Sequence, residues 1–140
     1  MKKNDENTLV EFQIKAIELL DTKFKTPKVA LPKDITYQFE INLEHRFNIS
    51  EKLVMVVCAI AVKHEAELAM IKSSCVFVLP QINNYINADI QEVKLPSEFV
   101  TTINSISIST SRGMLFSFLK GTYLHNAIIP IIDPAAFNVK

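Results

Sequence analysis

The chain has 140 residues, 49% of them hydrophobic, and its 15 basic residues balance its 15 acidic ones. A chain of this size can bury about two thirds of its unfolded surface, so we expect one folded domain at residues 9–140, after a polar, disordered stretch at residues 1–8. The zero net charge gives no pull toward nucleic acid, and the most apolar run, residues 53–62, is too short for membrane insertion.

Alternating apolar and polar residues predict two strands in the first third of the chain. In the first strand Phe12 and Ile14 share one face, but the alternation slips at Ile17, which predicts a bulge there. The second strand, residues 35–47, is the most regular, with apolar side chains on one face and charged or amide side chains on the other. We expect this polar face of the sheet to be solvated.

The third strand, residues 53–62, is apolar on both faces, which is typical of a strand that is covered on both sides. One face can meet the core of the domain, and a partner subunit is the simplest cover for the other. We therefore expect Val56, Cys58 or their neighbours on that face to lie under a subunit contact or a second layer. A fourth strand follows at residues 66–79, and hairpin-like connections predict a meander.

The last third of the chain is less regular. Residues 80–96 form a connector that is long and apolar for a solvated loop, and long loops are often functional. Residues 97–120 fit a helical stripe, but residues 106–111 alternate as a strand does, so periodicity alone leaves this segment open. The tail at residues 127–134 contains two prolines, which exclude a regular helix or a central strand.

Short motifs follow one another in a fixed order along the chain. They are Phe12-Gln13-Ile14, Ile17, Asp21, Phe24 and Pro27, then Asn104, then Gly121-Thr122-Tyr123, Pro130, Ile131-Ile132-Asp133 and Phe137. In order and spacing these motifs resemble the SecB family of protein-export chaperones over nearly the whole chain. The resemblance implies one long helix at residues 98–119 and an α+β fold, in which this helix packs on a four-stranded antiparallel β-sheet arranged as a meander.

The sequence also departs from the family pattern. An Arg of the family's helix would fall at Ser111, whereas this chain has Arg112. The chain ends at Lys140, where the family has a second helix and often an acidic or metal-binding tail that contacts the secretion ATPase. The resemblance still implies a docking face for that ATPase on the sheet. It would carry the carboxylates Glu11, Glu40 and Glu44.

The family resemblance implies a holdase, a chaperone that binds unfolded or newly synthesised polypeptides without ATP or a cofactor, with protein export as the pathway that the family serves. It also implies a homotetramer built as a dimer of dimers. Binding an unfolded chain shifts folding by mass action, so no active site is needed. Two alternatives stay open. One is a dedicated interaction module for a single partner, as in SecB-like chaperones of an antitoxin, and the other is an undetected enzyme.

We expect clients to bind in an apolar groove between the helix, the connector and the sheet. The groove would be lined by Ile82, Tyr85, Ile86, Met55, Met70, Met114, Ile128 and Ile129. The flexible thioether side chains of methionine adapt to varied partners. Apolar side chains in a loop are either exposed for contact with a partner or buried in the core of the domain. The alternative is that these side chains fill the core of the domain, and the sequence does not separate the two.

No arrangement of ionisable residues predicts catalysis. His45 and His64 each have a glutamate beside them, but neighbouring residues of a strand point to opposite faces, so neither pair can act as a relay. Cys58 and Cys75 form neither a CxxC motif nor a disulfide framework, and the N-terminus shows no signal peptide. We therefore expect a cytoplasmic protein that is not an enzyme and has no metal site.

Overall fold

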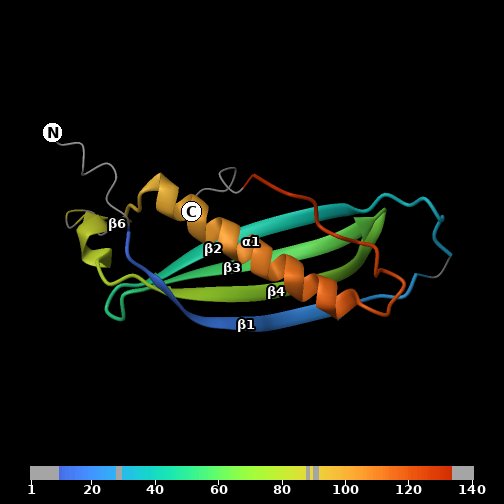
Figure 1. Cartoon of the computed structure of the whole chain (residues 1–140), viewed down its shortest axis with the longest axis horizontal. Coiled ribbons are helices and arrows are strands. Elements are labelled where there is room, and N and C mark those ends of the chain that lie inside the picture. Colours follow the sequence, from blue (N-terminus) through green and yellow to red (C-terminus); the bar gives the residue numbers. More distant parts are fainter. Residues whose placement is uncertain (1–9, 28–29, 88, 90–91, 134–140) are drawn as a thin grey trace.

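The computed structural model describes residues 10–27, 30–87, 89 and 92–133. A four-stranded antiparallel sheet consists of β1 (Gln13–Phe24), β2 (Gln38–Asn48), β3 (Leu53–His64) and β4 (Ala66–Val78), and one long helix, α1 (Ser97–Leu119), lies on one face of it (Figure 1). The connector contains the 3-10 helix η2 (Ile82–Tyr85) and a small sheet of β5 (Ile86–Asn87) and β6 (Glu92–Val93). The fold is α+β, and the disorder predicted for residues 1–8 lies outside the described residues.

The strand order is β1-β4-β3-β2, so the predicted meander is wrong for β1. Only β2, β3 and β4 follow one another as neighbours, whereas β1 lies at the far edge and pairs with β4, as in a Greek key. Residues 25–37 must therefore cross from one edge of the sheet to the other. Alternation along a strand shows which side chains share a face but not which strand lies beside it, and this is why the pattern missed the crossing.

β1 is irregular near the predicted position. Its register with β4 shifts between Ile14 and Ala16 and again between Leu19 and Asp21, so two irregularities bracket Ile17 where one was expected. Each shift inserts a residue into β1, which keeps the apolar side chains before and after it on the same face of the sheet. That face is the one that carries α1.

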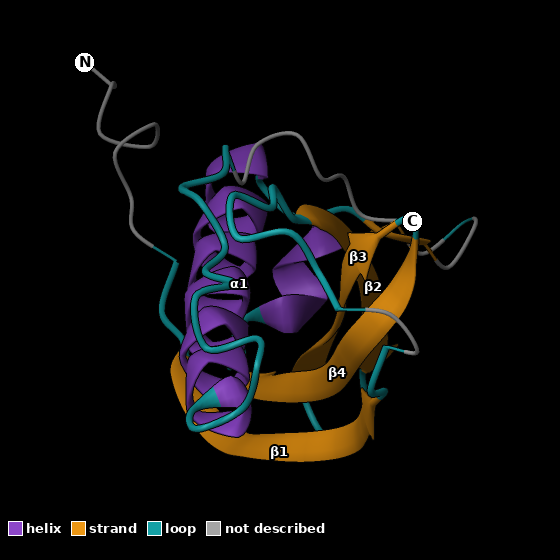
Figure 2. Ribbon diagram, turned by 90° about the vertical axis from the view of Figure 1, so that its right-hand side faces the viewer, coloured by secondary structure: helices purple, strands orange, loops and turns teal. Residues whose placement is uncertain are grey.

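The core lies between α1 and the two central strands. α1 packs on β3 and β4, and Figure 2 shows it as a separate layer against the sheet. Alternate residues of β3 are at most 1% exposed beneath it, namely Val54, Val56, Cys58, Ile60 and Val62. They share one core cluster with the α1 residues Phe99, Ile103, Ile108, Leu115 and Leu119. This confirms that a second layer covers the face of Val56 and Cys58, and the layer is the helix.

The opposite face of β3 is partly buried in the single chain, where Leu53, Met55 and Ala59 are half-buried. Val57 is 3% and Ala61 7% exposed in the single chain. Their neighbours on β2 are Glu44 and Glu40, whose long side chains stand on the same face. The single chain therefore covers part of this face, and a subunit contact over the rest of it stays a prediction.

Two polar pairs join α1 to the sheet within this apolar interface. His45 Nε2 of β2 donates to Asn104 Oδ1 at 2.7 Å, and the hydroxyl groups of Ser73 on β4 and Ser111 on α1 are also 2.7 Å apart. Buried polar groups are costly unless they are hydrogen-bonded, so each pair favours one position of α1 along the sheet. Two of the serines that made this segment ambiguous in the sequence are hydrogen-bonded in the helix, Ser111 with Ser73 and Ser107 with the Ile103 carbonyl.

Candidate functional site

The predicted client groove of the connector is only partly available. Ile82 is fully buried and belongs to the core cluster, whereas Tyr85 and Ile86 are half-buried. The backbone of the connector is also held, since the Lys94 N–H donates to the Tyr85 carbonyl at 2.7 Å. The prediction is therefore wrong for Ile82, whose side chain fills the core instead of waiting for a partner.

The remaining residues of the predicted groove lie in separate places. Met55 and Met70 alternate with the residues buried under α1, so they are on the sheet face turned away from the helix. Met114 of α1 packs against the core, and Ile129 of the tail is only 3% exposed, but Ile128 is 55% exposed. No single groove can contain this set.

A strip of exposed apolar side chains runs along β1 instead. Its members, each between 40% and 51% exposed, are Ile14, Ile17, Leu19, Leu20 and Phe24. Within the described residues β1 has a strand on one side only, so its outer backbone groups have no ladder partner in the sheet. An edge strand with an apolar flank is a template for a further strand or an extended peptide. The sequence shows which of these residues share a face but not that β1 is an edge strand.

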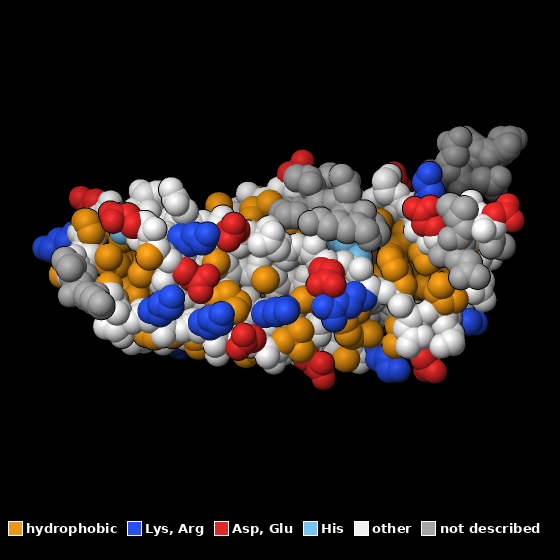
Figure 3. Space-filling model, turned by 180° about the vertical axis from the view of Figure 1, so that it is seen from behind, with side chains coloured by type: hydrophobic (Ala, Val, Ile, Leu, Met, Phe, Trp, Pro, Cys, Tyr) orange, Lys and Arg blue, Asp and Glu red, His pale blue; other side chains and the backbone are white. Residues whose placement is uncertain are grey.

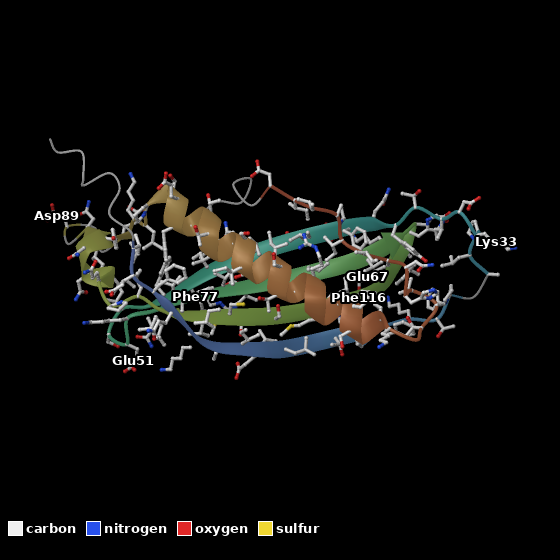
Figure 4. All side chains as sticks on the ribbon, viewed as in Figure 1. Lys33, Glu51, Glu67, Phe77, Asp89 and Phe116 are labelled. Carbon is white, nitrogen blue, oxygen red and sulfur yellow. The ribbon has the colours of Figure 1, made fainter. Side chains whose placement is uncertain are left out.

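Two adjoining hollows lie beside the loop that crosses from β1 to β2. Their volumes are about 510 and 610 Å³. The residues common to both are Thr26, Pro27, Ala30, Leu31 and Pro32. Tyr37 and Tyr123 line the first hollow, and residues 64–68 line the second. Figure 4 shows that Lys33 of this loop lies at the opposite end of the molecule from Glu51, so the hollows are far from the predicted connector groove.

Aromatic side chains connect the β1 strip with the first hollow. The ring of Phe24 packs edge-on against Phe118 and Tyr123, with ring centroids 6.3 and 5.5 Å apart. The hydroxyl of Tyr123 donates to the Lys25 carbonyl at 2.6 Å, which ties the end of β1 to the turn after α1. Burial first, and then nearby Tyr37, raise the pKa of the Tyr123 phenol, so it stays a neutral donor. Phe24 and Tyr123 therefore join the strip to the first hollow, whose lining is mixed and includes Thr26, Lys33 and Asn126.

The carboxylates predicted for partner docking are only partly brought together. Glu40 and Glu44 are exposed on β2, on the sheet face away from α1, and each is paired, with Lys63 at 2.9 Å and Arg46 at 2.8 Å. Glu11 precedes β1, at the opposite edge of the sheet. Figure 3 shows acidic and basic side chains interspersed over this face. The face is therefore mixed in charge.

The part of the chain that the structure describes contains no group of three or more His, Cys, Asp or Glu residues that could hold a metal ion. Among the same residues, no helix is both long and apolar enough to cross a membrane. Cys58 and Cys75 are buried free thiols, and burial raises the pKa of Cys58 to about 11, so it is uncharged at neutral pH. An uncharged, inaccessible thiol is a weak nucleophile.

The fold is shared with a SecB-like chaperone from Mycobacterium tuberculosis, whose structure was solved in complex with a ChAD peptide from an antitoxin. The two structures align with a TM-score of 0.58 at 15% sequence identity, over 86% of this chain and 90% of the other. No protein-family model and no curated protein sequence matches this chain. The chain therefore has a SecB-like fold.

Proposed function

We propose that this protein is a chaperone that binds extended, apolar segments of unfolded polypeptides without ATP. The observation that carries the proposal is the pair of hollows beside the crossing loop, both lined by Pro27 and Leu31. Tyr37 and Tyr123 line the first hollow, and Tyr123 contacts the partly exposed ring of Phe24. Burying one apolar side chain of a client there contributes roughly 1.5–3 kcal/mol. Small-molecule sites fix their ligand with several converging polar groups, whereas an apolar wall tolerates many sequences.

Substitutions in the hollow test this proposal. Leu31→Ser and Tyr37→Ser together should weaken binding of a reduced, carboxymethylated unfolded protein by at least about tenfold, because they remove about 1.4 kcal/mol or more of apolar contact. Ile131→Ser is the matched control, since Ile131 is 96% exposed and lies outside the hollows. Fluorescence anisotropy of the labelled client measures both. Equal affinity of the double variant and the control would remove the hollow from the client site.

A homotetramer, assembled as a dimer of dimers, is part of the proposal. β1 supports it, because its outer edge lacks a neighbouring strand in the described part of the chain and its apolar flank is exposed. Pairing with β1 of a second copy would satisfy this edge and bury Ile14, Ile17 and Leu19. The hollows at the crossing loop would then stay free for clients.

A dedicated chaperone for one partner is the second candidate. It is favoured by the SecB-like neighbour from Mycobacterium tuberculosis, which was solved with a peptide of an antitoxin. The two candidates differ in what the protein carries in its native host. Mass spectrometry of co-purified polypeptides should find many sequences for a general holdase, and one stoichiometric protein for a dedicated chaperone.

The cellular setting is also a proposal. A cytoplasmic holdase could deliver clients for export by docking a secretion ATPase on the sheet face of Glu40 and Glu44. These carboxylates lie on one face of β2 and do not line the hollows, which supports a division between client and partner surfaces.

A further inference from the structure

A third hollow lies beside the turn that follows α1. Its volume is about 670 Å³, and Phe116, Lys120 and Ile128 are among the residues that line it. Asn126 lines this hollow and also the first hollow beside the crossing loop. Figure 4 shows Phe116 on the half of the molecule that carries Lys33 of that loop. The first and third hollows therefore meet at Asn126, and a chain that fills the first can continue into the third.

The turn beside this hollow is held by its own hydrogen bonds. The Thr122 N–H and the Thr122 hydroxyl both donate to the Leu119 carbonyl, at 3.0 and 2.7 Å, and the Leu124 N–H donates to the Thr122 hydroxyl at 3.1 Å. Gly121 has a φ of 82°, a backbone conformation that favours glycine. The two bonds to Leu119 occupy one of the last carbonyls of α1, where the helix dipole disfavours an anion. The wall of the hollow is therefore preformed, and the negative end of the helix is partly screened.

Two exposed apolar side chains line the third hollow. Phe116 is 52% and Ile128 55% exposed. They come from α1 and from the segment after it, so the fold brings them together. Single exposed apolar side chains are common on protein surfaces, but a pair that lines one hollow offers a place for an apolar side chain of another polypeptide. An apolar or aromatic residue is therefore the first requirement for a segment that binds here.

The polar part of the lining complements an acidic residue. Exposed Lys120 contributes an ammonium group, and none of the described residues that line this hollow is an Asp or a Glu. His125 Nδ1 lies 2.9 Å from the Thr122 carbonyl, which can only accept, so Nδ1 carries a proton and donates it, and Nε2 is left for a partner. The second hollow differs, because Glu65 and Glu67 line it. A carboxylate is therefore favoured at the third hollow over the second.

We infer that the third hollow is a subsite of the client site, and that it accepts an acidic residue next to an apolar one. The inference rests on the proposed function and deepens it, because it names the client segments that bind most tightly. The apolar side chain of the client contacts Phe116 and Ile128, and its carboxylate pairs with the Lys120 ammonium. In its neutral form His125 accepts a backbone N–H of the same segment at Nε2. The remainder of the segment extends into the first hollow.

A pair of labelled peptides tests the charge preference. Both are apolar and have about 12 residues, which span about 40 Å when extended. One carries Phe-Asp at each end, so that the direction of binding does not matter, and the other carries Phe-Asn there. Fluorescence anisotropy in low salt should show about three- to fivefold tighter binding of the Asp peptide, and added salt should reduce this difference. Lys120→Ala should abolish the difference by weakening only the Asp peptide. Lys94→Ala, which removes an exposed lysine outside this hollow, is the matched control.

A substitution of Phe116 tests the apolar part of the subsite. Phe116→Ser should weaken both peptides about tenfold, because it removes apolar contact, and it should leave the fold intact because the side chain is half exposed. Ile131→Ser changes a 96% exposed residue outside the hollow and should leave both affinities unchanged. Circular dichroism verifies that each variant is folded.

The outcomes separate the inference from the proposed function. Equal binding of the two peptides by wild-type protein overturns the inference, and so does a folded Phe116→Ser variant with unchanged affinity. In either case weaker binding by the Leu31→Ser and Tyr37→Ser double variant shows that the proposed function still stands. If wild-type protein binds neither peptide nor a reduced, carboxymethylated unfolded protein, the proposed function fails and the inference fails with it.

Discussion

The two edges of the sheet differ in what covers their apolar side. Along β1, Ile17 and Leu19 are 45% and 51% exposed, whereas Leu43 of β2 is 4% exposed and Phe47 is half-buried. A helix is about 10–12 Å across and strands lie about 4.8 Å apart, so one helix covers roughly two strands. α1 lies on β3 and β4, and the tail runs on the β2 side. Among the described residues, the apolar side of β1 is therefore more exposed than that of β2, and we expect an assembly surface there.

The largest expected effect is at the centre of the covered region. Leu115 of α1 is 1% exposed, and Leu115→Ala should lower the free energy of unfolding by about 2–5 kcal/mol, because it leaves a cavity between helix and sheet. The neighbouring Phe116 is 52% exposed, so Phe116→Ala is the matched control and should change stability far less. Urea unfolding followed by circular dichroism measures both. Similar losses for the two variants would contradict the assigned orientation of α1.

The pH dependence of stability tests whether α1 shields the Cys58 thiol from solvent. Burial raises its pKa from 9.0 to about 11, so above pH 9 the unfolded chain loses this proton before the folded chain does. Stability from the neutral thiol is complete below pH 9 and should fall by about 2–3 kcal/mol as the pH rises through 11. Cys58→Ala should lack this component. A wild-type and a variant protein with parallel pH profiles would show that the thiol is not shielded by α1.

At the open edge we expect a change of assembly with little change of fold. Ile17→Lys and Leu19→Lys together place two charges on the apolar flank of β1, which should split the proposed tetramer into smaller, folded species. Glu51→Lys, in an exposed turn, is the control. Light scattering at micromolar concentration measures the mass. A wild-type monomer, or a double variant that stays tetrameric, would show that β1 is not the subunit contact.

The smallest effect on stability is expected on the face away from α1. Glu40→Lys with Glu44→Lys should leave the melting temperature nearly unchanged, because exposed ion pairs contribute little. If a motor ATPase docks there, the reversal should weaken that contact, and the loss should shrink as salt is added. Glu11→Lys, at the other edge, tests whether docking spans the sheet. Unaltered affinity of the double variant would exclude this face.

Most of the fold could be predicted, and the failures have a common cause. The alternation of β2 and the two-sided apolar run of β3 gave both strands to within a few residues, and the predicted helix at residues 98–119 differs from α1 by one residue. The helix was predicted from the family resemblance, because the serines at alternate positions of this segment are also typical of a strand. The hydrogen bond between Ser111 and Ser73 is visible only in the structure. The position of β1 beside β4 depends on a long connection, and periodicity carries no information on that.

The candidate site was predicted less well than the fold. An apolar residue in a connecting segment can be buried in the core, as Ile82 is, or exposed to solvent, as Ile128 is. The sequence does not distinguish the two cases. The exposure of the apolar side chains on β1 also cannot be read from the sequence, because it follows from the position of β1 at the edge of the sheet. In both places the burial of a side chain depends on where the single helix and the tail lie.

Cross-linking of a bound client tests the central claim most directly. An unfolded protein carrying a benzophenone photo-cross-linker should react with residues 24–37 and 123–126, beside the hollows of the crossing loop, and its adducts can be mapped by mass spectrometry. The account predicts adducts concentrated there and few on the flank of β1, which the proposed subunit contact covers. Adducts confined to the sheet face of Glu40 and Glu44, or an absence of adducts at saturating client, would contradict it.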